Sequence, residues 1–114
     1  MTAFNSPYGN RAVGMGNTTG TGNVQLIAAP TNNLRIRIRT IVIYNSDATL
    51  TTGVYMKSNT TIIFGPIPAP AKGGSIMVNL ADPIECNFNE ALNFAAIDAV
   101  NQLYVSVLGT MVVQ

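Results

Sequence analysis

Carboxylates are the first side chains to consider for chemistry in this chain. Two of them suffice for glycoside hydrolysis, and Glu85 and Glu90 lie close together in the sequence. A glycosidase generally also needs a larger scaffold and aromatic platforms for the sugar, whereas this chain has no Trp. We therefore expect both carboxylates to be solvated loop residues without a catalytic role.

Histidine is absent from the chain, which removes the usual general base near neutral pH, the Ser-His-acid triad and the commonest metal ligand. Cys86 is the single cysteine, so it can form neither a Cys-His pair nor an intramolecular disulfide. A zinc site would need carboxylates almost exclusively. The five acids are scattered along the chain, at Asp47, Asp82, Glu85, Glu90 and Asp98. The sequence therefore predicts that the protein is not an enzyme.

Calcium and phosphate sites are also disfavoured. Asp47 and Asp82 lie in predicted turns, but neither begins an Asp-x-Asp-x-Asp run of ligands. The glycines of residues 14–16 and 20–22 follow no predicted strand and precede no suitably placed lysine, so they do not form a phosphate-binding loop. We expect no cofactor and no bound metal.

The composition indicates a protein that works against partners. Charged residues make up only 10% of the chain, against roughly 25% in typical soluble domains, and 47% of the residues are hydrophobic. The net charge of +1 offers no electrostatic footprint for nucleic acid or an anionic membrane. No segment resembles a cleaved signal or a membrane span, so we expect neither secretion by such a signal nor membrane insertion.

Short strands must position any binding residues. Apolar and basic residues alternate over 34–39, and residues 40–44 continue as an apolar run, which predicts the clearest strand in the chain. Further strands are expected over residues 24–29, 50–57, 60–64, 75–80, 90–98 and 103–113, with a bulge at Gly109. Residues 84–89 fit no single element, although Ile84, Cys86 and Phe88 would share one face if the segment is extended. The two-residue connection Ser58-Asn59 between the strands over 50–57 and 60–64 predicts a hairpin.

Two segments are less regular. Three prolines at alternate positions in residues 65–74 predict an extended, polyproline-like surface loop. Residues 90–98 have helical propensity, but Leu92, Phe94 and Ala96 alternate as in a strand, which we favour.

The pattern as a whole predicts a single all-β domain, either a two-sheet sandwich or a small barrel, over residues 24–114. Residues 1–23 are rich in Gly, Asn and Thr and predict an extended N-terminal arm. Phe4 and Tyr8 lie in this arm, where no local core is available to them, so we predict that they dock on another chain.

Arg35, Arg37 and Arg39 share one face of the clearest strand. They are candidates for a basic stripe that binds an acidic partner surface. The alternative is the solvated face of an amphipathic strand, which is the simpler interpretation.

Several short sequence motifs resemble those of small proteins encoded near the major capsid gene of tailed bacteriophages. They are the run of residues 35–39, the Gly-Pro-Ile-Pro of residues 65–68 before Gly73-Gly74, Asp82-Pro83, and the Asn-Glu-Ala-Leu-Asn-Phe of residues 89–94. The resemblance covers roughly residues 34–113 and is to capsid decoration, or cement, proteins.

The resemblance implies a single jelly-roll domain, an antiparallel β-sandwich, that decorates the phage head. It implies a virion structural protein that is made in the host bacterial cytoplasm and binds the major capsid protein. It also implies a homotrimer on local threefold axes that ties capsomers together. The alternative is a phage fibre or a receptor- or carbohydrate-binding module, but the loops carry Pro, Gly and Asn where such a module would gather aromatic and acidic residues.

Overall fold

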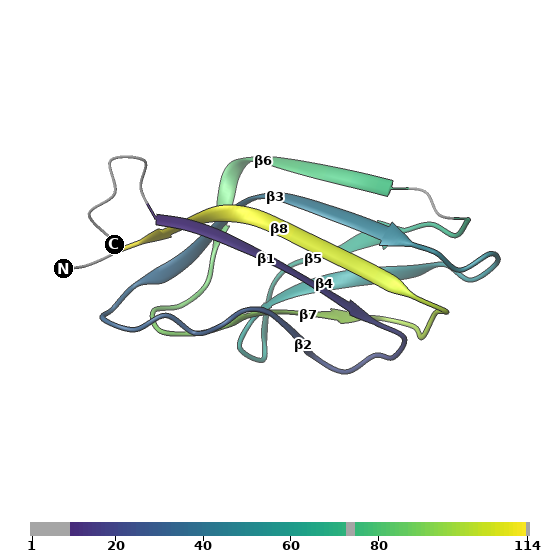
Figure 1. Ribbon diagram of the computed structural model, residues 1–114, viewed down its shortest axis with the longest axis horizontal. Helices are drawn as coiled ribbons and strands as arrows, with labels where there is room; N and C mark the ends of the chain where they lie inside the picture. The colour runs from purple at the N-terminus through teal and green to yellow at the C-terminus, as the bar shows by residue number, and fades with distance from the viewer. Residues whose placement is uncertain (1–9, 73–74, 114) are drawn as a thin grey trace.

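The computed structural model describes residues 10–72 and 75–113, which fold into two four-stranded antiparallel sheets packed as a sandwich (Figure 1). The strands are β1 (Asn10–Thr18), β2 (Val24–Ile27), β3 (Arg35–Asn45), β4 (Thr52–Ser58), β5 (Thr61–Ala69), β6 (Ser75–Glu85), β7 (Leu92–Ala96) and β8 (Leu103–Val112). The first sheet has the order β1-β8-β3-β6 and the second the order β2-β7-β4-β5.

This strand order is that of a jelly roll, an eight-stranded double-sheet fold. The prediction of an all-β, jelly-roll-like antiparallel sandwich is confirmed. None of the described residues forms a helix that is long and apolar enough to cross a membrane.

The core lies between the sheets, and the alternation of β3 explains how it forms. Ile36, Ile38, Ile41 and Ile43 are all buried against the second sheet. The alternation shifts by one residue at Arg39, because Ile38 pairs with Gly109 of β8 whereas Thr40 pairs with Leu108. The bulge predicted at Gly109 is therefore formed by an extra residue on the facing strand, β3.

The second sheet completes the core with Val54, Met56, Leu92 and Phe94, which are fully buried. Each such side chain contributes roughly 1.5–3 kcal/mol by leaving water. Leu92–Ala96 forms strand β7, so the preference for a strand over a helix in this segment is confirmed.

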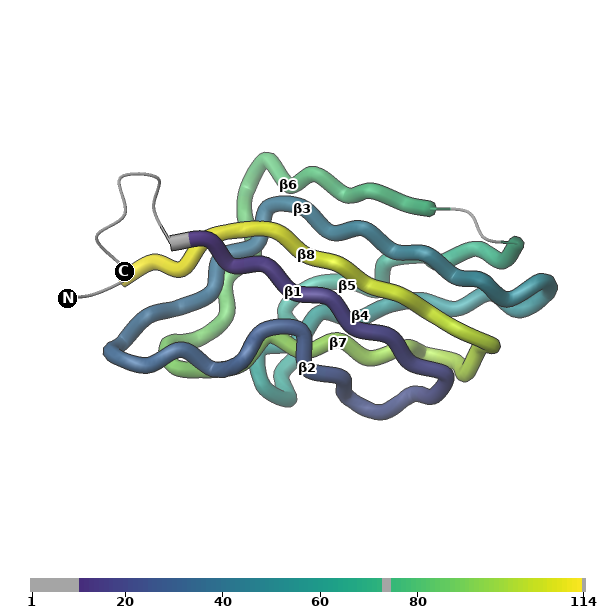
Figure 2. Tube along the Cα trace, viewed as in Figure 1, coloured from purple at the N-terminus to yellow at the C-terminus, as the bar shows by residue number. Residues whose placement is uncertain are grey.

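The N-terminal boundary of the sandwich was predicted wrongly. Residues 10–18 are part of the first sheet as β1 and pair with β8 along their whole length, as Figure 2 shows. The inward positions hold Ala12, Gly14 and Gly16, which are small because β2 lies directly behind them. This lack of large side chains is what made the strand look like an arm. Phe4 and Tyr8 lie outside the described residues.

Residues 65–69 also differ from the prediction, because they belong to strand β5 and not to a surface loop. β5 pairs only with β4 and forms the edge of the second sheet. Pro66 and Pro68 are tolerated there, because an edge strand can lack N–H donors on its free side. The hairpin between β4 and β5 is confirmed, with Ser58 paired to Thr61 and Asn59 in the left-handed region at a φ of 56°.

Candidate binding surfaces

The outer face of the first sheet carries a broad apolar surface. Its members point away from the core and come from all four strands. We call them the outer apolar face: Val13, Met15, Val42, Tyr44, Met77, Tyr104 and Leu108. Met15 and Met77 are 74% and 63% exposed, which is unusual for side chains of this size.

Strand register explains why these residues form one surface. Met15 pairs with Ser106, which pairs with Val42, which in turn pairs with Met77. One row thus crosses β1, β8, β3 and β6 from edge to edge. In the next row Tyr44 pairs with Tyr104, and their rings lie 5.7 Å apart between centroids. Such aromatic pairs add about 0.5–1.5 kcal/mol beyond area burial.

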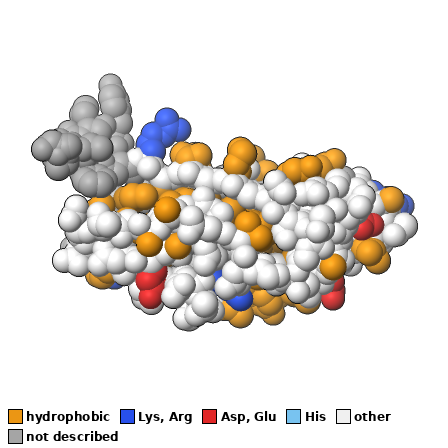
Figure 3. Space-filling view, turned by 60° about the horizontal axis from the view of Figure 1, so that its bottom comes forward, with side chains coloured by type: hydrophobic (Ala, Val, Ile, Leu, Met, Phe, Trp, Pro, Cys, Tyr) orange, Lys and Arg blue, Asp and Glu red, His pale blue; other side chains and the backbone are white. Residues whose placement is uncertain are grey.

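The outer apolar face is also free of charge. Across residues 13–17, 40–44, 75–79 and 104–108, the outward positions between its apolar members hold only Ser, Thr and Asn. Its six most exposed side chains present on the order of 500 Å², near the upper end of the roughly 300–600 Å² typical of the largest patch on a monomer. Figure 3 brings the side of β2 and β7 forward and shows scattered hydrophobic side chains there, among polar surface and a few charged side chains.

A hollow of about 230 Å³ lies on this face, between β1 and β8. Met15, Asn17, Tyr104 and Ser106 form its walls, and Gly16 lies at its floor. The hollow exists because Gly16 has no side chain and the side chain of Val105, its partner in β8, is buried. Only backbone therefore lies between the flanking outward side chains. It is large enough to accept one apolar side chain of a partner.

The three arginines of β3 do not form a stripe of unpaired positive charges, because two of them bind Glu85. Arg35 Nη1 donates to Glu85 Oε1 at 2.8 Å, and Arg37 Nε donates to Glu85 Oε2 at 2.6 Å. These two bonds, with the Arg35 bond the larger cause, hold the pKa of Glu85 below its usual range. The cluster of three side chains carries a net charge of one, whereas the sequence suggested three free cations.

Arg35 has a second contact, because its guanidinium lies over the ring of Phe88 at 4.1 Å from the centroid. Arg39, the bulged residue, is exposed. The structure thus separates the predicted stripe into a bonded pair and one exposed arginine. Their role in partner binding stays a prediction.

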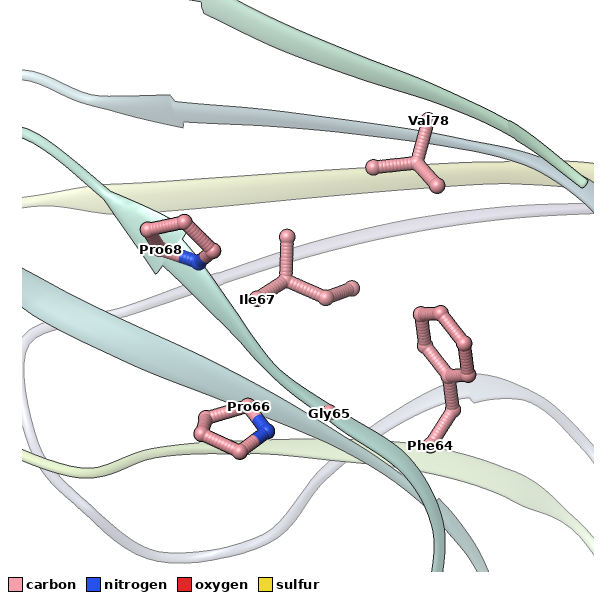
Figure 4. A pocket seen from close by; sticks show the side chains of 6 residues that line it. All are labelled: Phe64, Gly65, Pro66, Ile67, Pro68 and Val78. Carbon is pink, nitrogen blue, oxygen red and sulfur yellow. The ribbon is translucent and has the colours of Figure 1, made fainter.

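An apolar groove of about 470 Å³ opens between the edge strands β5 and β6. Figure 4 shows Phe64 and Ile67 of β5 pointing toward Val78 of β6, with Pro66 and Pro68 beside them. A small-molecule site normally combines such an apolar lining with a few polar groups that fix the ligand. The only polar atoms that line this groove belong to the backbone. The groove is therefore better suited to bind the apolar surface of a partner protein than a polar metabolite.

The carboxylates and the thiol have structural partners. Glu90 accepts a hydrogen bond from the Ser58 hydroxyl at 2.6 Å, and that hydroxyl accepts one from the N–H of Asn87. Cys86 is buried nearby, and its burial raises the pKa of the thiol to about 11. The thiol therefore lacks the thiolate character of a nucleophile.

Asp47 holds the ends of two loops together. Its carboxylate accepts hydrogen bonds from the N–H groups of Thr49 and Leu50 at 2.9 Å and of Asn101 at 2.7 Å. These bonds lower the pKa of Asp47 and occupy the oxygens that a calcium ion would need. In the described part of the chain, no three Cys, Asp or Glu side chains gather as a metal site.

Sequence reasoning missed the outer apolar face. The alternation of Tyr104 and Leu108 with buried valines gave a signal for part of it. Met15 gave none, because it lies in the segment interpreted as an arm, and Met77 is one apolar residue among several in β6. The face becomes visible only when register brings the four strands together.

Comparison of the chain with protein-family models gave no match, and its comparison with curated proteins gave none either.

Proposed function

We propose that this chain is a virion structural protein, a capsid decoration or cement protein that binds the outer surface of a bacteriophage head and stabilises the contacts between capsomers. The major capsid protein is the proposed partner. The mechanism is mechanical, since many copies each add a modest interface energy across capsomer joints.

The outer apolar face is the observation that carries the proposal. A rigid four-stranded sheet presents it without a single charged side chain in its centre. Such a surface is costly to leave in water and suits a permanent interface. The apolar area of about 500 Å², with its Ser, Thr and Asn neighbours, approaches the roughly 800 Å² per partner of a standard interface.

The jelly roll and the sequence resemblance support the same role. The fold occurs in viral capsid proteins as well as in lectins, so it does not decide the function by itself. The homotrimer on local threefold axes rests on the resemblance alone and is part of the proposal.

The first test is the copy number of the chain in purified phage particles, measured by quantitative mass spectrometry against the major capsid protein. We expect hundreds of copies in a simple ratio to the capsid subunit. A few tens of copies would indicate a fibre or vertex component, and absence from particles would remove the proposal.

The second test locates the binding face. Capsids that lack the chain are incubated with the purified protein, and the bound copies are counted. The double variant Met15→Lys, Met77→Lys should lose at least tenfold in occupancy, because it places charges in the centre of the outer apolar face. A matched variant, Leu50→Lys with Ile62→Lys, adds the same charges at residues that are 53% and 50% exposed elsewhere. Equal loss in both variants would contradict the assignment of this face.

A further inference from the structure

The four edges of the sandwich are not protected equally. On one side, β1 and β2 lie so close together that Gly14 nearly touches the Leu26 carbonyl. β2 is also only four residues long. On the other side, β5 carries Pro66 and Pro68, which remove two N–H donors from its edge. Three of the edges therefore have one of the usual protections against strand pairing.

Strand β6 has none of these protections over its first five residues, before the shift in its pairing with β3. Residues 75–81 read Ser-Ile-Met-Val-Asn-Leu-Ala and contain no proline and no charge. Residues 75–79 pair with β3 on one side only, so their other side presents free backbone donors and acceptors over roughly 17 Å, before the register shifts after Asn79. A long, uncharged, alternating edge is a template for another strand.

The side chains of β6 add an apolar reason for pairing. Val78 and Leu80 face the core but are only half-buried, because the sandwich is open between β5 and β6. Phe64, across the groove, is half-buried as well. A strand added to β6 would cover this opening and remove apolar surface from water.

A second copy of β6 fits this edge, because the sequence is compatible with a twofold axis at Val78. In an antiparallel pair centred there, Val78 lies opposite Val78, Ile76 opposite Leu80, and Met77 opposite Asn79. Apolar inward residues thus meet apolar residues, and no like charges face each other. A closed isologous contact of this kind uses the same strand from both copies.

We propose that β6 pairs with β6 of a second copy about this axis, which joins the first sheets of two molecules into one eight-stranded sheet. The axis is perpendicular to the sheet, so both outer apolar faces lie on the same side. The inference does not depend on the proposed capsid role, because the contact involves the isolated chain alone.

The test is the mass of the purified protein by light scattering, from micromolar to near-millimolar concentration. Pairing through β6 predicts an even number of subunits, whether a dimer or a pair of trimers. Val78→Lys and Val78→Glu should each halve the mass, because two like charges would face each other across the axis. An equimolar mixture of the two variants should restore the wild-type mass, because the new lysine of one copy would then face the new glutamate of the other.

If the mixture regains the wild-type mass, both variants must be folded, since an unfolded chain could not form the pair. Circular dichroism checks the folding of each variant independently. Ile62→Lys on β5 is the matched control and should leave the mass unchanged. Hydrogen exchange provides a measurement without substitutions, since amides of residues 75–81 should exchange faster on dilution. A wild-type monomer or trimer at all concentrations, or an unchanged mass for Val78→Lys, would overturn the inference.

Discussion

Gly14 of β1 lies so close to the carbonyl oxygen of Leu26 in β2 that a Cβ atom at this position would overlap with that oxygen. This contact closes one side of the sandwich, whereas the β5–β6 side stays open as a groove. The asymmetry follows from residue size, because small inward residues on β1 let the two sheets meet. The open side keeps the larger Phe64 and Val78.

The first prediction concerns this contact. Gly14→Ala should lower the free energy of unfolding by about 2 kcal/mol or more, because backbone atoms must move to admit the methyl group. For a domain of this size the melting temperature should fall by about 10 °C. Gly20→Ala is the control, since nothing lies within 4 Å of a Cβ there, and it should change stability by less than about 0.5 kcal/mol. Equal effects at both positions would contradict the close approach.

Much of the fold could be predicted from the sequence, for a physical reason that differs between elements. The strand at Arg35–Asn45 and the strand at Leu92–Ala96 bury one face and therefore alternate visibly. β1 could not be recognised, because its inward residues are small and resemble those of an arm. The prolines of β5 led to the prediction of a loop where the structure has a strand. A strand can contain these prolines only at the edge of a sheet, and which strand lies at the edge is known only once the sheet is assembled.

The candidate site was less predictable, because it depends on contacts between distant segments. Glu85 neutralises Arg37 from 48 residues away, so the basic stripe could not be judged from β3 alone. The outer apolar face needs the register of four strands to become a surface. The absence of histidine, in contrast, is a property of the sequence itself and limits the chemistry directly.

The second prediction concerns the Arg35–Glu85–Arg37 cluster. Glu85→Gln should destabilise the protein by at most about 1 kcal/mol at low ionic strength, because the three side chains are partly exposed. The loss should shrink in high salt, which screens the pairing. Urea denaturation at two salt concentrations measures both effects, and Asp98→Asn, at an exposed acid, is the control. A cost for Glu85→Gln that is independent of salt would contradict an electrostatic origin.

The third prediction concerns acid stability. The pKa of Asp47 is lowered in the folded state by hydrogen bonds from the Thr49, Leu50 and Asn101 N–H groups. Its contribution to stability is therefore fully present above its ordinary value of 3.8 and is lost as the pH falls through the lower folded value. Asp47→Asn should lower the melting temperature at neutral pH, and the difference from wild type should narrow below about pH 4.

A pH series of thermal melts tests this expectation. Asp82→Asn, at an exposed acid on β6, is the control. A difference between wild type and Asp47→Asn that stays constant or widens toward acid would show that the carboxylate charge is not what holds the two loops.

The last prediction concerns the thiol of Cys86, which is 1% exposed. Burial raises its pKa to about 11, so on the order of one molecule in ten thousand carries the thiolate at neutral pH. A disulfide reagent should therefore react with the native protein only as fast as the surrounding structure opens, and urea should accelerate the reaction. Leu50→Cys gives an internal control, because its second thiol lies on an exposed loop and should react at once. If Cys86 reacted as fast as the thiol at position 50 in the native protein, the segment after β6 would open readily. The bond from the Cys86 N–H to the Ile36 carbonyl would then not hold it in place.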